Sequence, residues 1–178
     1  MLKILGIAAL VLVALLAVVL VYAATRPNTF RVERSLTIQA PPEKIFAHLQ
    51  DFRRWGDWSP WDRIDPAMKR TYSGAESGLG AAYAWEGNNN IGAGRMEIAE
   101  SVPSSRIRIA MHFLRPMEAR NTAEFTLQLD GDGTTVTWAM YGPNNYLGKL
   151  IHVFINMDRM IGVNFETGLA NLKTLAER

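Results

Sequence analysis

The C-terminal residues Tyr146–Glu177, YLGKLIHVFINMDRMIGVNFETGLANLKTLAE, have the pattern of a long helix that needs a partner surface. Apolar side chains recur every three or four residues, as on a helix with one buried stripe. The stripe consists of Leu147, Leu150, Ile151, Phe154, Ile161, Phe165, Leu169, Leu172 and Ala176. A straight helix of these 32 residues would be about 48 Å long, but a domain of this size has a radius of gyration of about 15 Å. We therefore expect a break within Met157–Gly162, where Gly162 is a weak helix former.

The partner surface is predicted by strand patterns that precede this helix. Seven segments show them: Phe30–Ile38, Lys69–Ser73, Ala81–Glu86, Gly94–Ser101, Arg106–Phe113, Asn121–Leu129 and Thr134–Tyr141. Short, turn-rich connections between the last six favour antiparallel neighbours. Apolar and polar residues alternate in Arg106–Phe113 and Asn121–Leu129, which predicts one buried and one solvated sheet face.

Two short helical segments are predicted between the first and second strands. The sequence Pro41-Pro42-Glu43 can start a helix over residues 42–51. The aromatic segment Trp55–Trp61 is expected to form a second short helix or a packed loop, because Pro60 limits helix after Ser59. The predicted fold class is α+β, with a seven-stranded antiparallel sheet and a long C-terminal helix across its apolar face.

Residues Ile4–Tyr22 form an uncharged, apolar segment. As a helix, these 19 residues would span about 28 Å, close to the roughly 30 Å of a bilayer core. Thirteen of them are Leu, Ile or Val, which contributes roughly −5 kcal/mol toward insertion. We expect a transmembrane anchor over residues 1–25, contacting the membrane through residues 4–22, and one folded domain over residues 26–178.

A cleaved signal peptide is the alternative for this segment. The apolar region of a signal peptide usually has about 7–15 residues, fewer than this run, and Val21–Ala24 is a poor cleavage site. An uncleaved anchor predicts a single-pass protein of the cell membrane. Because Lys3 on one flank competes with Arg26, Arg31 and Arg34 on the other, the side of the membrane that carries the domain stays open.

Composition and spacing exclude several classes of function. Of 19 Lys and Arg and 17 Asp and Glu residues, only Lys3 precedes residue 26, so the rest of the chain is nearly neutral and has no basic footprint for nucleic acid. The absence of cysteine excludes disulfides, thiolate metal sites and cysteine nucleophiles. His48, His112 and His152 do not have metal-ligand spacing. We predict no metal, no cofactor and no nucleic-acid partner.

Few charged residues qualify as catalytic candidates, and the catalytic set stays unknown. The aspartates of Asp57–Asp65 lie in a turn-rich segment and are interpreted as caps or turn formers. Arg108 and His112 share a strand face and could form an acid-base pair, but alternation places them on the polar face. Asp158 lies close to the apolar stripe, where we expect a buried structural partner for an arginine or for backbone.

The predicted interior is rich in large side chains. Those expected on the core-facing side are Tyr83, Trp85, Met96, Ile98, Ile109, Met111, Phe113, Phe125, Leu127, Trp138, Met140, Phe154 and Phe165. They could all interdigitate as an ordinary core. Alternatively, a curved sheet closes incompletely over the helix and leaves an apolar cavity with its mouth near Trp55, Trp58 and Trp61. Periodicity alone does not separate these two arrangements.

Five motifs carry a resemblance to a known family. They are Phe52-x-x-Trp55-x-x-Trp58-Ser59-Pro60-Trp61, Gly92-x-Gly94-x-Met96-x-Ile98, Asn121-x-Ala123-Glu124-Phe125, Gly133-Thr134-x-Val136-Thr137-Trp138, and Met160-Ile161-Gly162-x-x-Phe165-Glu166-x-Gly168-Leu169-x-Asn171-Leu172-Lys173. With the order of elements, they resemble the polyketide cyclase/dehydrase and lipid-transport group of the START-like SRPBCC superfamily, which includes members with an N-terminal membrane anchor. The resemblance covers roughly residues 30–175.

The resemblance implies a helix-grip fold, in which the sheet wraps around the C-terminal helix and an apolar ligand cavity lies between them. It supplies no catalytic set, because proteins of this fold have many functions. With the cavity adopted, the ligand-binding candidates are the core-facing set above together with Trp55, Trp58 and Trp61.

Three hypotheses for the function follow. The first is a membrane-tethered binding or transfer domain for a hydrophobic small molecule or lipid, with Tyr146–Met157 as a movable gate. The second is a cyclase- or hydratase-type enzyme that uses Tyr83, Arg108, His112 or Glu124. The third is a chaperone-cofactor-like module that binds protein through the outer sheet face. The composition favours binding over catalysis.

Overall fold

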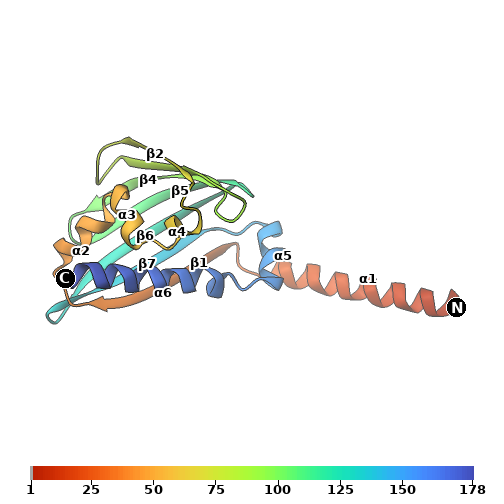
Figure 1. The fold of residues 1–178 in the computed structure, drawn as a ribbon. Coiled ribbons are helices and arrows are strands. Elements are labelled where there is room, and N and C mark those ends of the chain that lie inside the picture. Colours follow the sequence, from red (N-terminus) through yellow and green to blue (C-terminus); the bar gives the residue numbers. More distant parts are fainter. Residues whose placement is uncertain (1) are drawn as a thin grey trace.

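The computed structural model describes residues 2–178 and shows one curved sheet gripping a long helix (Figure 1). The N-terminal part consists of α1 (Leu2–Thr25), β1 (Thr29–Ile38), α2 (Pro42–Leu49), the 3-10 helix η1 (Phe52–Arg54), α3 (Trp55–Trp58) and α4 (Trp61–Ile64). The strands β2 (Lys69–Gly74), β3 (Ala81–Glu86), β4 (Ala93–Val102), β5 (Arg106–Arg115), β6 (Ala119–Asp130) and β7 (Gly133–Pro143) follow, and then α5 (Tyr146–Phe154) and α6 (Met157–Ala176). The predicted α+β helix-grip class is confirmed.

The sheet is antiparallel throughout and has the strand order β1-β7-β6-β5-β4-β3-β2. Each of β2 to β7 pairs with its neighbour in sequence, which agrees with the short connections. The first strand returns to pair with the last, with Thr29 opposite Pro143 and Ile38 opposite Thr134. The start of β1 and the end of β7 therefore share one end of the sheet.

The C-terminal helical region is interrupted two residues earlier than the sequence predicts. The chain leaves the helical conformation at Ile155 and Asn156, and α6 starts at Met157. The side-chain oxygen of Asn156 accepts a hydrogen bond from the Arg159 backbone N–H at 2.9 Å, which is the geometry of a helix N-cap. A capping residue therefore sets the break, and Gly162 continues inside α6 as a buried residue.

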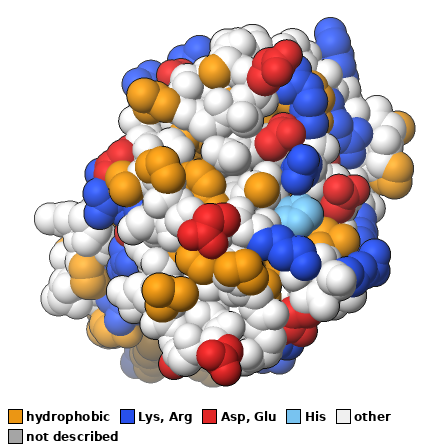
Figure 2. All heavy atoms as spheres, turned by 90° about the vertical axis from the view of Figure 1, so that its left-hand side faces the viewer, with side chains coloured by type: hydrophobic (Ala, Val, Ile, Leu, Met, Phe, Trp, Pro, Cys, Tyr) orange, Lys and Arg blue, Asp and Glu red, His pale blue; other side chains and the backbone are white. Residues whose placement is uncertain are grey.

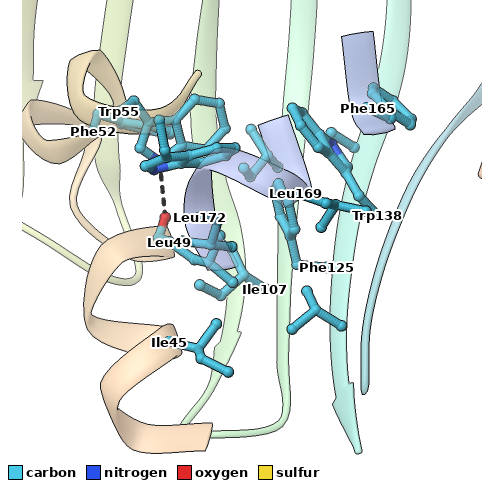
Figure 3. Close-up of a cluster of buried hydrophobic side chains, with 14 of the residues drawn as sticks. Ile45, Leu49, Phe52, Trp55, Ile107, Phe125, Trp138, Phe165, Leu169 and Leu172 are labelled. Atoms are coloured by element: carbon cyan, nitrogen blue, oxygen red, sulfur yellow. Dashed lines mark hydrogen bonds between the residues drawn. The ribbon is translucent and has the colours of Figure 1, made fainter. Parts of the chain in front are cut away.

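The core lies where α6, α2 and α3 cover the concave face of the sheet (Figure 3). Ile45 and Leu49 of α2 meet Leu172 of α6, and all three are fully buried. The Trp55 ring N–H donates a hydrogen bond to the Leu49 carbonyl oxygen at 3.1 Å, which satisfies a polar group inside the core. The aromatic segment is therefore part of the packed interior, as two short helices divided at Pro60.

The outer face of the sheet carries ion pairs between neighbouring strands. Glu100 of β4 accepts a hydrogen bond from Arg106 at 2.9 Å and forms an ion pair with Arg108 at 2.9 Å, and Arg108 also pairs with Glu124 of β6 at 3.1 Å. The Arg106 guanidinium holds the pKa of the Glu100 carboxyl below its usual value. Arg108 and Glu124 thus point away from the concave face because they occupy the alternate positions of their strands.

A second charged cluster ties β1 to α6. The Arg34 guanidinium lies 2.9 Å from Asp158 and 2.6 Å from Glu166. Asp158 has the expected arginine partner, but its side chain is largely exposed rather than buried, because it lies in the first turn of α6 at the rim of the sheet. The adjacent guanidinium lowers the pKa of Asp158.

The N-terminal helix extends away from the sheet and contacts the domain at its C-terminal end only (Figure 1). Residues Lys3–Thr25 are long and apolar enough to cross a membrane. Ala23 is fully buried, whereas the larger side chains of Ile4–Tyr22 are mostly exposed. This arrangement is that of an apolar helix whose side chains are not buried against the domain.

We predict that residues 26–178 fold without α1. The described core contains one residue of α1, Ala23, so deleting residues 1–25 removes little apolar burial. The truncated protein is expected to be soluble and to have the near-ultraviolet circular dichroism of the full chain in detergent. Aggregation of the truncated protein would show instead that α1 is part of the fold.

A second prediction concerns close packing at Gly94 on β4. A Cβ atom there would lie 2.4 Å from the Trp85 ring and 2.8 Å from the His112 carbonyl oxygen. Gly94→Ala is therefore expected to lower the free energy of unfolding by about 1–3 kcal/mol, measured by urea denaturation of the full chain in detergent. Gly56→Ala is the control, because no atom outside the adjoining helical backbone lies within 4 Å of that Cβ position. Equal stabilities of the two variants would contradict the prediction.

Candidate ligand-binding cavity

A cavity of about 870 Å³ lies between the concave sheet face and the helices α4, α5 and α6. This volume falls within the roughly 300–1,000 Å³ of small-molecule pockets. Its deep wall is apolar and consists of Trp55, Trp61, Met68, Tyr83, Trp85, Met96, Met111, Phe113, Ala123, Trp138, Met140, Ile161 and Phe165. An incompletely closed interior is therefore present, rather than a uniformly filled core.

Aromatic contacts hold this wall in place. The rings of Trp138 on β7 and Phe165 on α6 stack with centroids 4.2 Å apart and planes 12° apart. Trp61 meets Trp138 edge-on at 5.4 Å, and Trp85 meets Phe113 edge-on at 5.7 Å. Because the stacked pair joins the sheet to α6, it fixes the width of the cavity on that side.

The structure brings ten of the sixteen predicted ligand-binding residues to the cavity. They are Trp55, Trp61, Tyr83, Trp85, Met96, Met111, Phe113, Trp138, Met140 and Phe165. Their positions agree with the expected concave face, although contact with a ligand stays a prediction.

Five other predicted residues lie in the packed core beside the cavity. They are Trp58, Ile98, Ile109, Phe125 and Leu127. Phe125, for example, is fully buried and packs against Trp58 at 6.0 Å and Trp138 at 4.9 Å. The four strand residues among them share the sheet face of the cavity but not its end of the sheet, and strand alternation reports only the face. Trp58 lies on α3 and packs into the same core.

Phe154 is the exception, because it is neither in the core nor in the cavity. Its side chain is 75% exposed. It is the last residue of α5, and the chain leaves the helical conformation there before α6 begins. The apolar stripe predicted for one continuous helix therefore does not face the core on both sides of the break. The expectation that Phe154 faces the core is wrong.

The cavity opens at the end of the sheet next to α1. Its exposed lining residues come from the β3–β4 loop, the β5–β6 hairpin and the segment around α5: Asn89, Asn90, Arg115, Pro116, Met117, Glu118, Arg120, Pro143, Asn145 and Met160. Strand pairing places these connections at the same end of the sheet as the start of β1. The residues paired there are Glu86 with Ala93, Phe113 with Ala119, and Thr29 with Pro143. The expected mouth at Trp55, Trp58 and Trp61 is wrong: Trp55 and Trp58 are buried and Trp61 is half-buried.

Sequence reasoning missed the residues at this mouth. Gly87–Asn90 and Arg115–Pro116 belong to the turn-rich connections between strands, and turn residues carry no information about a cavity until the register is known. His152 and Gly148 of α5 were missed because they lie outside the apolar stripe. Glycine at position 148 also allows close packing, since a Cβ there would lie 2.6 Å from the Asn144 side-chain oxygen.

Charged groups at the mouth are partly paired. Glu118 lies 2.8 Å from the His112 ring, and Arg115 lies 3.3 Å from Glu86. Burial lowers the pKa of His152, so its imidazole is neutral at pH 7. The mouth therefore combines amide, guanidinium and carboxylate groups above an apolar interior.

Of the four acid-base candidates, only Tyr83 lines the cavity. Burial raises the pKa of its hydroxyl well above the usual value, so it stays protonated at neutral pH. Arg108 and Glu124 pair on the outer face, and His112 pairs with Glu118. These placements do not bring the four groups together.

The aspartates near the cavity have structural partners. Asp65 accepts from the backbone N–H groups of Ala67 at 3.2 Å and Asn88 at 2.8 Å, as expected for a turn former. Asp62 pairs with Arg70 at 2.9 Å. Within residues 2–178, no group of three or more histidine and carboxylate side chains has a metal-binding arrangement.

Comparison with solved structures supports the fold. Protein CV1439 from Chromobacterium violaceum is 18% identical, with a TM-score of 0.59, over 86% of this chain and 99% of the other. The Aha1 dimer from Colwellia psychrerythraea is 16% identical, with a TM-score of 0.55, over 83% and 96% of the two chains. The di-domain ARO/CYC StfQ from the steffimycin biosynthetic pathway is 12% identical, with a TM-score of 0.59, over 84% and 51%. At these identities the likeness shows the fold alone.

No curated protein sequence matches the chain significantly. The family model described as polyketide cyclase / dehydrase and lipid transport matches residues 29–177, which include every strand and all helices after α1. The match therefore covers the whole folded domain with its cavity, and the chain belongs to this family.

Proposed function

We propose that this protein is a membrane-tethered domain that binds or transfers a hydrophobic small molecule in the cavity between the sheet and α6. The observation that carries the proposal is the apolar cavity of about 870 Å³, which opens at the end of the sheet next to α1. Its aromatic and methionine side chains suit a flat or flexible apolar ligand. The polar mouth suits a ligand with one polar end, such as a lipid-like amphiphile.

The tether places this cavity near a source of such ligands. In the proposed arrangement, residues 1–25 form a single-pass anchor and residues 26–178 form the ligand-binding domain. An apolar molecule that leaves a bilayer loses favourable burial of about 25 cal/mol for each Å² exposed to water. A mouth held close to the membrane shortens that exposure, and α5, which borders the mouth, is the proposed gate.

The geometry supports binding more strongly than the two alternatives. An acid-base enzyme needs at least two ionisable groups within reach of a ligand, but the proposed groups are divided between the cavity and the outer face. A protein-binding module would use an apolar outer face, whereas Arg106, Arg108 and Glu124 give that face a charged character.

The proposal predicts that the full chain retains apolar molecules. Native mass spectrometry of the protein extracted in mild detergent is expected to show adducts that organic solvent releases and that lipid mass spectrometry identifies. The Ala123→Trp variant, prepared in parallel, is expected to carry fewer adducts. Preparations that never retain or exchange an apolar ligand would count against the proposal.

Filling the cavity is expected to weaken binding of a neutral apolar probe, 1-aminoanthracene. Ala123 lines the cavity from β6, so Ala123→Trp is predicted to lower probe affinity roughly tenfold or more by occupying the space of the ligand. Thr122→Trp is the matched control, because the adjacent position on β6 faces the outer side. Fluorescence titration measures both. Equal losses, or none for Ala123→Trp in a folded protein, would place the probe outside this cavity.

A further inference from the structure

The helix α5 is attached to the end of the apolar helix α1. The Tyr146 hydroxyl donates a hydrogen bond to the Leu20 carbonyl oxygen at 3.1 Å, and Ala23 is fully buried. The Lys149 ammonium donates to the Asn28 side-chain oxygen at 2.6 Å, and the Asn144 backbone N–H donates to the Asn28 carbonyl oxygen at 2.7 Å. These contacts fix α5 at the level of the last turns of α1, where Figure 1 shows it lying across the helix end.

This level corresponds to the boundary of a bilayer. If α1 spans a hydrocarbon core of roughly 30 Å, Leu20 lies within about two residues of the end of the apolar run at Tyr22. Tyr22 and Arg26 adjoin there, with the Arg26 guanidinium 5.6 Å from the centre of the Tyr22 ring. Tyrosine and arginine at a span end are typical interface anchors. Tyr146, which is hydrogen-bonded to Leu20, therefore lies at the same interfacial level.

Exposed apolar side chains continue from this junction along α5 and into the start of α6. We call the connected segment from Leu147 to Val163 the α5–α6 elbow. Leu147 is 57% exposed and Phe154 is 75% exposed, and their seven-residue separation places them on one side of α5. Ile155, Met160 and Val163 continue the exposed apolar surface and, with Phe154, Asn156 and Arg159, line a shallow depression of about 560 Å³.

The opposite end of the domain provides a contrast. Figure 2 shows that end, where acidic and basic side chains lie between separate groups of apolar ones. Leu129 is 76% exposed beside the β6–β7 turn, and its pairing with Thr134 places it at the far end of the sheet from Pro143. Exposure of one large apolar side chain is therefore not specific to the elbow. What distinguishes the elbow is its position beside α1.

We propose that the α5–α6 elbow inserts its exposed apolar side chains into the interfacial layer of the bilayer that α1 spans, and thereby seats the mouth of the cavity on the membrane surface. The proposal rests on the membrane tether of the proposed function. A lipid surface is the occupant that α1 itself brings to the elbow, because the hydrogen bond to Leu20 fixes α5 beside the end of the apolar run. An apolar helix face at that depth gains free energy by burial at the headgroup boundary.

The cysteine-free sequence allows a direct test on the full chain. Single-cysteine variants Phe154→Cys, Val163→Cys and Leu129→Cys are labelled with the environment-sensitive fluorophore NBD and reconstituted in phosphatidylcholine vesicles. Some vesicles contain phosphatidylcholine with a doxyl quencher near the headgroup. Leu129→Cys is the matched control, because it replaces an equally exposed apolar residue at the far end.

The expected result is blue-shifted emission at positions 154 and 163, with quenching by the doxyl lipid roughly twofold or more above that at position 129, because only the elbow reaches the interfacial layer. Equal quenching at the three positions overturns the proposal. A blue shift at the elbow without doxyl quenching also overturns it, because the covering surface would then be protein, either a second copy or another chain.

Failure of this inference is distinguishable from failure of the proposed function. Loss of doxyl quenching with intact 1-aminoanthracene binding removes the elbow contact and leaves the cavity function in place. Doxyl quenching without any 1-aminoanthracene binding removes the cavity function and leaves the elbow contact in place. A chain that does not enter vesicles at all removes the tether and, with it, the elbow contact.

Discussion

The stacking of Phe165 on Trp138 is the contact on which the rest of the domain depends. It joins α6 to β7, and β7 in turn pairs with both β1 and β6. Gly168 lets the two elements approach, since a Cβ there would lie 2.8 Å from the Trp138 ring. Once α6 is held at this distance, the inward-facing residues at one end of the sheet fill the space beneath it. At the other end they do not, and that difference is the cavity.

The sizes of the inward-facing side chains explain why the cavity lies at one end. Along β6 the inward positions are Ala119, Asn121 and Ala123 toward the mouth and the larger Phe125 and Leu127 in the core. Strand β4, two strands away, also has its smallest inward residue, Gly94, at the mouth end and Ile98 at the core end, although the Trp85 ring occupies the space above Gly94. Small residues opposite a helix leave volume that backbone rearrangement does not recover, because the sheet is held by its hydrogen bonds. The gradient along β6 therefore contributes volume to the cavity, whereas β5 and β3 keep the large residues Met111, Phe113 and Trp85 in its wall.

The apolar periodicity and the turn residues were sufficient to predict the bounds of the strands to within about two residues. Strand β3, for example, spans Ala81–Glu86 in both the prediction and the structure. They were insufficient for the cavity, because alternation assigns a residue to a face and not to an end. Phe125 and Met111 are therefore indistinguishable in the sequence, yet one is core and the other lines the cavity. The break before α6 was displaced because the cap at Asn156 is a local hydrogen bond that overrides the weak helix propensity of Gly162. The size gradient along β6 is visible in the sequence, but it indicates a cavity only once the strand register shows which end of the sheet holds the small residues.

The helix α5 differs from the rest of the domain in how it is held. Its only buried side chain is Lys149, whose ammonium is bonded to a neutral amide oxygen rather than to a carboxylate. A buried ammonium retains a desolvation cost that a neutral partner offsets in part, so α5 is held by polar contacts and by apolar side chains that are only half-buried, such as Leu150 and Ile151. Elements with few buried apolar contacts open at lower free energy than the core. The segment that borders the mouth is thus also weakly packed, and it is the one attached to α1. In the proposed function, movement of α5 would therefore change access to the cavity and the contact with α1 together.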